Sequence, residues 1–450
     1  MKALVREQHL SKIFFLALAA LVLCIVPLYR YFFYDGYASQ ENTYFHMRMS
    51  ETIFSGIFSA DPAVVMETSY FFDPFDALLG ISRFFIGTHA ALLLPFILGI
   101  ITLFFVYLTI AEYIPSAKQQ LIAGIFLLSC PLTITLFTHA TSYGFIAFLM
   151  SAGIYFYNRK TWLAYIILPL LCFYSLYHSI VAILFLLLLK KKPFALSVCL
   201  VILAGIFSFL RHDSFQFQIP SLLILIQQLF SDFGSSFGLS IFGILLACFG
   251  LSTIQKKELW IVLCISILFI FVSPLYAIYF IPLLAYSASY GFFSLLERQW
   301  SLSHLQNIAV LLLILGILFS ATSMISRIAQ ENPTPLHIQG LVWLGKNIED
   351  KTIILTDKQY GFMAEYFTHQ QVLFDKNTPV TNIPLETSFI FYAKNPEQTT
   401  TLLDRYHIDY IIIFSETPHA QLSNYLLTKE NFKKIFENSE ITIWKIEGPL

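Results

Sequence analysis

The sequence predicts a polytopic α-helical membrane protein that ends in a small water-soluble α/β domain. The 450-residue chain is 57% hydrophobic and 12% charged, whereas soluble domains carry about 25% charged residues. Apolar runs approaching the roughly 20 residues that cross a bilayer recur as far as about residue 324. Beyond about residue 325 the apolar runs are short and bounded by polar residues, which is typical of a soluble sheet.

Charge and cysteine usage exclude several classes of function. The net charge of −1 gives no support to a nucleic-acid partner. The six cysteines all lie in or beside apolar runs, so they form neither a disulfide framework nor a metal-binding spacing. They are Cys24, Cys130, Cys172, Cys199, Cys248 and Cys264. We interpret them as small apolar core residues.

About eleven segments are candidates for membrane helices. They are roughly 12–30, 90–111, 120–137, 142–157, 161–177, 178–190, 193–210, 237–253, 259–273, 274–295 and 304–324. The stretch 161–190 reads either as two short helices or as one broken helix. The chain therefore divides into a membrane domain, 1–325, and a C-terminal domain, 326–450.

Lysine and arginine set the orientation, because short cytoplasmic loops are enriched in them. Lys2, Arg6 and Lys12 precede the first apolar segment and place the N-terminus in the cytoplasm. Counting helices from there, the inside loops hold Lys118, Arg159, Lys160, Lys190, Lys191, Lys192, Lys256, Lys257 and Arg298. We therefore expect an integral protein of the cell membrane whose C-terminal domain is extracytoplasmic.

The C-terminal domain shows strands alternating with helices. The runs 353–355 and 410–414 suit buried strands, and 440–445 alternates like a half-exposed strand. Segments 398–406 and 421–427 look helical. This order suggests a small, doubly wound α/β domain. Neither a GxGxxG nor a Walker motif is present, so we expect no bound nucleotide there.

A long outer loop, 31–89, carries the first candidate site. It is acidic and aromatic, and loops of this length between membrane helices are usually functional. Asp35 and Glu41 could hold a divalent cation or act as a base, while His46 and Arg48 could grip a phosphate. The alternative is a solvated loop edge. Segment 75–87 reads as a short interfacial helix.

A second pair lies where the seventh apolar segment reaches the outer face. Arg211 and His212 could meet a lipid phosphate there. The alternative is the snorkelling end of a membrane helix.

Four short patches resemble the catalytic subunits of bacterial and archaeal oligosaccharyltransferases. Asp35-Gly36-Tyr37-Ala38 with Glu41 is similar to their first outer loop, and 44–48 is similar to an archaeal Tyr-Tyr-His-x-Arg stretch. Residues 229–234 look like the segment that carries a second acid, here Asp232. Segments 337–375 and 408–412 follow the family's order after its last membrane helix.

The resemblance implies a GT-C fold and roles for particular residues. By position, Asp35 matches an aspartate that is a catalytic metal ligand in the family. Asp232 is then a second ligand, or else a helix cap. In the outer turn where the family has an acidic pair, this chain has His139, which is either a replacement ligand or an interface residue.

The acceptor side departs from the family. Its hallmark, Trp-Trp-Asp-Tyr-Gly, corresponds here to 357–361, in which Tyr360 and Gly361 survive. A site that loses its hydrogen-bonding partner loses discrimination. The surviving residues therefore give no specific support to recognition of an Asn-x-Ser/Thr acceptor, and a glycan or lipid could replace the asparagine.

The resemblance implies a glycosyltransferase. It would move a sugar or glycan from a polyprenyl-phosphate-linked donor to a protein or glycan acceptor at the extracytoplasmic face. A Mg²⁺ or Mn²⁺ ion would neutralise the departing phosphate, unless Asp35 works alone in a metal-independent enzyme.

Two other functions stay open. One is a non-catalytic scaffold that kept the fold. The other is a transporter or flippase, although the apolar segments hold almost none of the ionisable residues that transport sites use.

Overall fold

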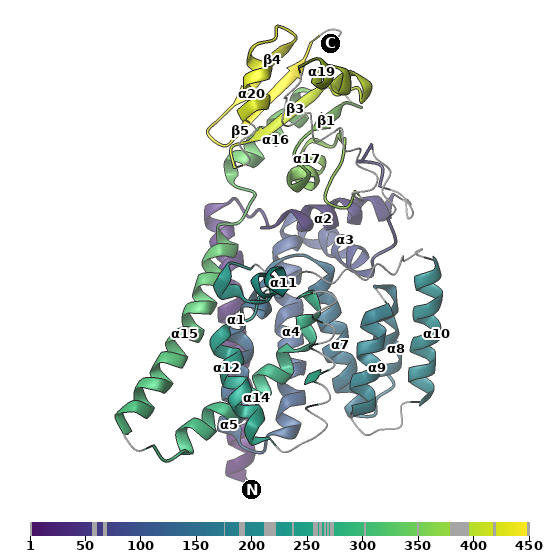
Figure 1. Ribbon diagram of the computed structural model, residues 1–450. Helices are drawn as coiled ribbons and strands as arrows, with labels where there is room; N and C mark the ends of the chain where they lie inside the picture. The colour runs from purple at the N-terminus through teal and green to yellow at the C-terminus, as the bar shows by residue number, and fades with distance from the viewer. Residues whose placement is uncertain are drawn as a thin grey trace. The chain divides into compact units, whose positions relative to one another are not determined.

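The structure is a computed structural model, and the chain forms two compact units (Figure 1). The first unit comprises Met1–Phe32, Asp73–Phe75 and Thr88–Gln330, and the second comprises Phe33–Phe72, Asp76–Gly87 and Glu331–Leu450. The described residues are 2–55, 61–65, 70–174, 176–188, 194–210, 222–235, 238–254, 260, 263–264, 267, 270, 274–300, 303–348, 351–378, 396–416 and 420–447.

All the regular elements that the structure describes in the first unit are helices. Its elements are α1 (Lys2–Phe33), α4 (Ala90–Tyr113), α5 (Ala117–Ser129), α6 (Pro131–Thr138), α7 (Ser142–Asn158), α8 (Ala164–Ile167), η2 (Leu168–Phe173), α9 (Leu176–Leu188), α10 (Phe194–Leu210), α11 (Leu222–Leu229), η3 (Ser231–Phe233), α12 (Ile241–Thr253), η4 (Pro274–Tyr279), α14 (Ile281–Glu297) and α15 (Ser303–Ala329). A short turn, η1 (Gly87–His89), precedes α4.

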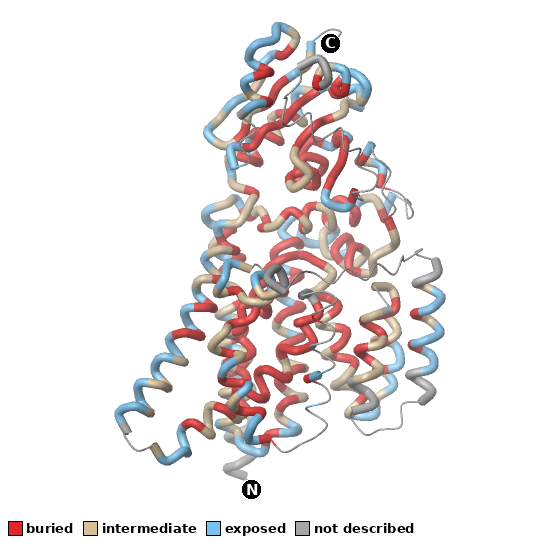
Figure 2. The backbone as a smooth tube through the Cα atoms, viewed as in Figure 1, coloured by how far each residue is buried: buried red, intermediate tan, exposed pale blue. Residues whose placement is uncertain are grey.

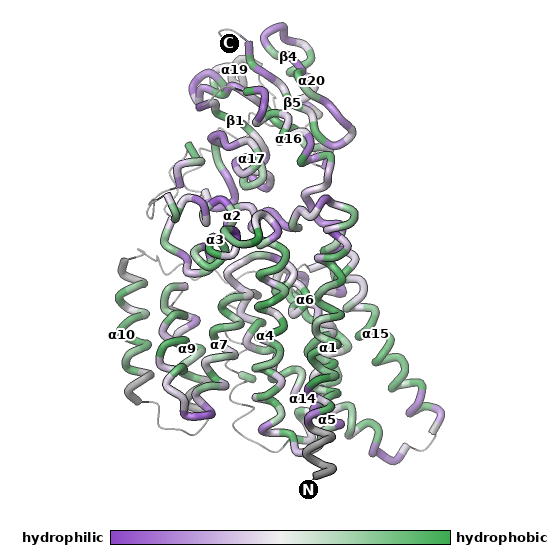
Figure 3. The backbone as a smooth tube through the Cα atoms, turned by 180° about the vertical axis from the view of Figure 1, so that it is seen from behind, coloured by the Kyte–Doolittle hydropathy of each residue, from purple (hydrophilic) through white to green (hydrophobic). Residues whose placement is uncertain are grey.

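Three described helices are long and apolar enough to cross a membrane. They are His9–Phe33, Pro74–Tyr113 and His304–Ala329, and one bent helix pair could make a fourth. Figure 3 shows α1, α4 and α15 as predominantly hydrophobic. A helix or helix pair lies over each range that we predicted except 259–273, most of which lies outside the described residues. The count of about eleven spans stays a prediction.

The predicted span 120–137 is broken into α5 and α6, which meet at an angle of 62°. The cause is Pro131, the first residue of α6. Proline has no N–H for the helix ladder, and it disfavours the helical region for the residue before it. Cys130 accordingly adopts an extended conformation, with φ −70° and ψ 119°.

The second unit holds a five-stranded sheet in the order β2-β1-β3-β5-β4. The strands are β1 (Ile353–Leu355), β2 (Gln371–Val372), β3 (Tyr410–Phe414), β4 (Phe432–Glu437) and β5 (Ile441–Ile446). The helices are α2 (Glu41–Phe54), α3 (Pro74–Ile86, whose first residues belong to the other unit), α16 (Pro335–Asn347), η5 (Lys358–Tyr360), α17 (Gly361–Thr368), α19 (Pro396–Arg405) and α20 (Ala420–Leu427).

The predicted strands and helices of the tail are present, but the sheet is mixed. The pairs β1–β2 and β1–β3 are parallel, whereas β3–β5 and β4–β5 are antiparallel. The prediction of a small, doubly wound α/β domain did not specify this antiparallel edge. The turn 438–440 is too short for a crossover, so β4 and β5 form a hairpin. Central strand β3 is buried at every position, as Figure 2 shows.

A segment of the outer loop extends this sheet beside β2. Val65 N–H donates to the Val372 carbonyl, and Val372 N–H donates to the Ala63 carbonyl, each at 2.9 Å. Val64 and Val372 form a parallel bridge. The edge of the short strand β2 is therefore covered by residues that lie far away in the sequence, which satisfies backbone groups that an open edge would leave unpaired.

Aromatic side chains join helix α2 of the outer loop to α17 of the tail. The Tyr44 ring lies 5.0 Å from that of Phe367 and 5.3 Å from that of Tyr366, and the rings of Phe45 and Phe362 are 5.0 Å apart. Offset and tilted ring pairs of this kind add to the burial of apolar area. This packing holds the outer-loop candidates against the tail.

Candidate active site

The outer loop begins with a tight turn at Asp35 and Gly36. Both have positive φ, 51° and 75°, and the Tyr37 N–H donates to the Tyr34 carbonyl at 2.9 Å. Asp-Gly is favoured at the centre of a type I′ turn, because both positions need the left-handed region. The turn leaves Asp35 exposed, and none of the described residues makes a hydrogen bond or ion pair with its carboxylate.

Glu41 begins α2 and is buried. Its Oε2 lies 2.9 Å from Nζ of Lys376, which follows β2. Burial raises the pKa of Glu41 to about 8, and the Lys376 ammonium only partly offsets this. At neutral pH the carboxyl group is therefore mostly protonated and can donate a hydrogen bond.

His46, on α2, is held by a carboxylate. Its Nδ1 lies 2.6 Å from Oδ1 of Asp76, and the Tyr70 hydroxyl donates to Oδ2 of Asp76 at 2.7 Å. The Asp76 side chain is completely buried. A carboxylate at Nδ1 favours the proton on that nitrogen and orients the ring.

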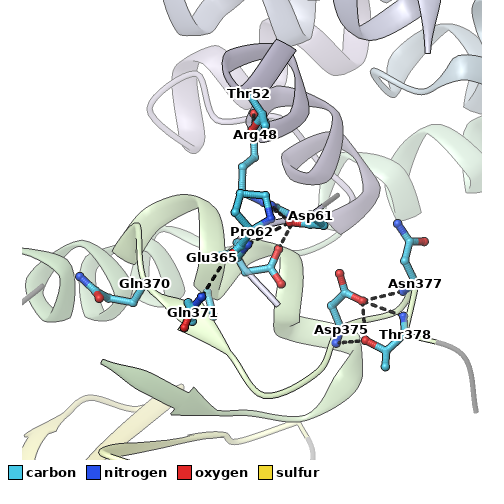
Figure 4. Close-up of polar contacts among 12 residues, drawn as sticks. Arg48, Thr52, Asp61, Pro62, Glu365, Gln370, Gln371, Asp375, Asn377 and Thr378 are labelled. Carbon is cyan, nitrogen blue, oxygen red and sulfur yellow. Dashed lines mark hydrogen bonds and ion pairs between the residues drawn. The ribbon is translucent and has the colours of Figure 1, made fainter. Parts of the chain in front are cut away.

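Arg48 joins α2 to the tail through two carboxylates (Figure 4). Its Nη2 lies 2.6 Å from Oδ2 of Asp61 and 2.7 Å from Oε2 of Glu365, and its Nη1 also donates to Asp61. Burial opposes the charge of Arg48, but Glu365 and Asp61 outweigh this and raise its pKa. Both guanidinium amino groups are thus already bound to protein anions.

Tyr360 and Gly361, the two residues that survive from the acceptor motif, are packed against other residues of the tail. The Tyr360 ring stacks on Phe414 with centroids 3.9 Å apart, and its hydroxyl donates to Glu416 at 2.8 Å. Gly361 begins α17 so close to Asp375 that a Cβ there would lie 2.9 Å from the Asp375 Cα. Only glycine permits this approach without displacing the neighbouring backbone.

The remaining described candidates lie in the first unit. Asp232 accepts a hydrogen bond from the N–H of Ile241, the first residue of α12, at 2.8 Å, and another from the Ser320 hydroxyl. Asp232 thus satisfies an N–H group at the start of α12, whose N-cap residue is Ser240. His139 is buried at the end of α6. Arg211 and His212 fall outside the described residues.

The second unit therefore brings Asp35, Glu41, His46, Arg48, Tyr360 and Gly361 into one compact body, and the first unit contains Asp232 and His139. Sequence reasoning gave no role to Asp61, Asp76, Glu365 or Asp375, the carboxylates that hold His46 and Arg48 or lie beside them. A signal existed for Glu365. It is a lone acid inside the apolar run 360–367, where a buried charge needs a partner.

The metal set that the resemblance implied is Asp35, Asp232 and His139. Both oxygens of Asp232 already accept hydrogen bonds from protein donors. Asp35 belongs to the second unit and Asp232 and His139 to the first, so this metal set stays a prediction and we derive no step through an ion. Acidic groups that could hold an ion do occur in the second unit, where Asp61, Glu365 and Asp375 gather.

Comparison with known proteins gives no match to a family model and none to a curated protein. Solved structures do match. The Archaeoglobus fulgidus oligosaccharyltransferase in complex with Zn and sulfate is 15% identical with a TM-score of 0.62, over 92% of this chain and 70% of that chain. ArnT from Cupriavidus metallidurans, bound to undecaprenyl phosphate, is 12% identical with a TM-score of 0.56, over 97% of this chain and 99% of that chain.

The chain has a GT-C fold. A further match is the A. fulgidus oligosaccharyltransferase AglB in complex with an inhibitory peptide and a dolichol-phosphate, at 13% identity and a TM-score of 0.62, over 92% of this chain and 71% of that chain. The GT-C fold confirms the resemblance that the sequence patches indicated. Together with the apolar helices, it makes this chain an integral membrane protein.

Proposed function

We propose that this chain is a membrane glycosyltransferase that transfers a sugar or glycan from a polyprenyl-phosphate-linked donor to an acceptor at the extracytoplasmic face. One observation carries the proposal. The chain shares the GT-C fold with two different proteins, and each was solved with a polyprenyl-phosphate lipid, dolichol-phosphate in one and undecaprenyl phosphate in the other.

The proposed reaction gives Asp35 the role of base. An acceptor hydroxyl or amide transfers its proton to the Asp35 carboxylate as its oxygen or nitrogen bonds to the anomeric carbon. The bond from that carbon to the phosphate oxygen breaks, and the polyprenyl phosphate leaves with the electron pair. Asp35 suits this role because it is exposed and is not used by any hydrogen bond or ion pair among the described residues.

The other candidates have supporting roles in the proposal. Glu41, protonated at neutral pH, donates a hydrogen bond to the donor or the acceptor. His46, oriented by Asp76, contacts the donor phosphate together with Arg211 and His212. Arg48 would have to exchange one of its carboxylate partners to do the same. Tyr360 and Gly361 shape the acceptor side.

The proposed enzyme could work with or without a metal ion. A Mg²⁺ or Mn²⁺ ion, when bound near the donor, supplies positive charge for the leaving phosphate. We propose the metal-independent variant, in which Asp35 acts as the base and Asp232 serves only its contacts with Ile241 and Ser320. Activity that survives a chelator would support this variant, and activity that needs Mn²⁺ would contradict it.

A non-catalytic scaffold is the second candidate, and the loss of both tryptophans and the aspartate from the acceptor motif favours it. A transporter or flippase is the third. Transfer by purified protein in detergent separates the enzyme from the transporter, because transport needs a sealed compartment and transfer does not.

The deciding experiment incubates purified protein with polyprenyl-phosphate and polyprenyl-diphosphate sugars and compares the wild type with Asp35→Asn. Asparagine tolerates the positive φ of the turn, so this variant removes the carboxylate charge and keeps the backbone. Asp404→Asn, at an exposed position on α19, is the matched control. Donor consumption that is lost in Asp35→Asn and retained in Asp404→Asn supports the enzyme. Equal consumption by all three proteins would exclude Asp35 as the base.

A further inference from the structure

Three buried carboxylates gather around Arg48 in the second unit. Asp61 comes from the outer-loop segment beside β2, Glu365 comes from α17, and Asp375 follows β2. One oxygen from each lies within 4.8 Å of one oxygen from each of the others. Figure 4 shows the three side chains converging, with Arg48 above Asp61 and Glu365.

The charges in this cluster do not balance. Three carboxylates face one guanidinium, and Arg48 is the one cation paired with them among the residues that the structure describes. The fully ionised cluster would carry a net charge of −2. Buried charge of one sign is costly unless it is neutralised. Positive charge, from a divalent cation or from protons, is therefore needed to neutralise the folded cluster.

Two of the carboxylates leave one oxygen without a hydrogen bond. Oδ1 of Asp375 accepts from the backbone N–H groups of Asn377 and Thr378 at 2.9 and 2.8 Å, and from the Thr378 hydroxyl at 2.9 Å. Its Oδ2 and Oε1 of Glu365 are buried and accept no hydrogen bond from any described residue. The two side chains belong to residues that are 0% and 1% exposed.

The partners of Asp375 and Glu365 fix how the two carboxyl groups are oriented. In Figure 4, the oxygen of Asp375 that is not bonded to Asn377 or Thr378 lies on the side of Glu365. The donors around Oδ1 fix the orientation of Asp375, and Arg48 fixes Glu365 from the other side. A buried carboxylate oxygen that has a fixed orientation and no hydrogen-bond donor can serve as a ligand for a cation.

The ligand chemistry selects a hard ion. The cluster offers carboxylate oxygens and contains neither sulfur nor imidazole among the described residues. Ca²⁺ binds oxygen at about 2.3–2.6 Å, so two ligands on opposite sides of one ion are separated by up to about 5 Å. Mg²⁺ binds at about 2.0–2.1 Å and needs a tighter octahedron. All three residues are buried, and a buried set of protein carboxylates favours Ca²⁺ over Mg²⁺, which dehydrates reluctantly and usually keeps several waters.

We propose that Asp61, Glu365 and Asp375 form a binding site for one Ca²⁺-sized divalent cation that ties the outer-loop segment 61–65 to the C-terminal tail. The ion neutralises the excess charge and links three separate parts of the second unit. The proposal does not rest on the proposed transfer, although Asp61 and Glu365 are the partners of Arg48, a candidate for the donor phosphate.

Protons compete for the same oxygens. Burial raises the pKa of Glu365 well above its usual range, with Arg48 acting in the opposite direction, and burial also raises the pKa of Asp375. A carboxyl group must be deprotonated to bind a cation, so cation binding becomes tighter as the pH rises.

The test uses the full chain in detergent, stripped with EDTA and dialysed into chelator-free buffer. Isothermal titration with CaCl₂ and with MgCl₂ measures binding, and thermal unfolding with and without 1 mM of each salt measures stabilisation. We expect one Ca²⁺ per chain, a higher unfolding midpoint in Ca²⁺, at least tenfold weaker binding of Mg²⁺, and tighter binding of Ca²⁺ at pH 8 than at pH 6.

Asp375→Asn is the decisive variant. Its amide oxygen keeps the three hydrogen bonds that Oδ1 accepts, and its NH₂ replaces the free oxygen alone. We expect Ca²⁺ binding to weaken at least tenfold there and in Glu365→Gln, while the exposed control Glu437→Gln binds like the wild type. No saturable Ca²⁺ binding by the wild type, or equal binding by Asp375→Asn, would overturn the proposal and leave protons as the neutralising charge. These readouts need no transferase activity, so they fail or succeed separately from the proposed function.

Discussion

Glu41 at the start of α2 and Lys376 after β2 form an ion pair of 2.9 Å, although they come from the outer loop and the C-terminal tail. The carboxyl group is buried and the ammonium is partly exposed, so the two partners experience different surroundings. Burial outweighs the attraction to Lys376, which keeps the pKa of Glu41 near 8. This group therefore changes its charge within the physiological range.

The stability of the second unit should fall as the pH rises toward 8. The pKa of Glu41 is about 8 in the folded chain and 4.5 for an unperturbed glutamate, so the folded state holds the proton more tightly. Its contribution is fully present below about pH 4.5 and is lost as the pH rises through 8; it is at most about 5 kcal/mol. Thermal unfolding between pH 5 and pH 8 should be less pH-dependent in Glu41→Gln.

Lys376→Met supplies the matched comparison. Removal of the ammonium takes away the largest influence that lowers the pKa of Glu41, so the loss of stability should move to higher pH. An identical pH profile for wild type and Lys376→Met would show that the pair does not control Glu41.

Arg48→Met should strongly destabilise the chain, by about 3–5 kcal/mol, because it leaves Asp61 and Glu365 buried without their cation. Adding Glu365→Gln should restore part of the loss, since one uncompensated charge disappears. Thermal unfolding of the two single variants and the double variant measures this coupling. Lys429→Met, at an exposed position, is the control; additive effects would argue against the pairing.

Gly361→Ala should destabilise the chain by about 1–3 kcal/mol through overpacking. The added methyl would lie 2.9 Å from the Asp375 Cα and 3.2 Å from the Phe374 carbonyl oxygen. Gly205→Ala is the comparison, because a Cβ at that helical position meets no atom within 4 Å. Unfolding midpoints that fall for the first substitution and not for the second confirm that close packing, and not a helical glycine in general, explains Gly361.

Asp232 has a test that separates capping from chemistry. Asparagine caps helices about as well as aspartate, whereas loss of the cap costs about 1 kcal/mol. If capping is its whole role, Asp232→Asn keeps both stability and donor consumption, and Asp232→Ala loses stability. Donor consumption that disappears in Asp232→Asn with an unchanged unfolding midpoint would instead assign the carboxylate a chemical role.

Much of the fold was predictable because it follows from local patterns. The apolar run 410–414 became β3, and the alternating run near 440–445 became β5, within the usual uncertainty of boundaries. Asp35 and Gly36 carried a turn signal that needed no partner elsewhere in the chain. In each case the information lay within a few residues of the element it specified.

The remainder depends on contacts between distant residues. No local pattern pairs Asp61 with Arg48. The sequence around Val64 also lacks the alternation that would predict a strand beside Val372. The mixed sheet likewise depends on which edge of β3 receives β5. The partner of Glu365 was hidden for the same reason: its apolar neighbours indicate a core, but its cation comes from α2.

The pairing of Ala63–Val65 with β2 has a consequence for biosynthesis. The outer-loop segment emerges from the ribosome about 300 residues before its partner, so at about 5–20 residues per second it waits roughly 15 to 60 seconds. During that time the segment has no strand to pair with, and a tail made without it would expose the edge of β2 to other chains. The tail can complete its sheet only after translation has passed Val372. Completion of the soluble domain is thereby coupled to synthesis of the whole preceding membrane region.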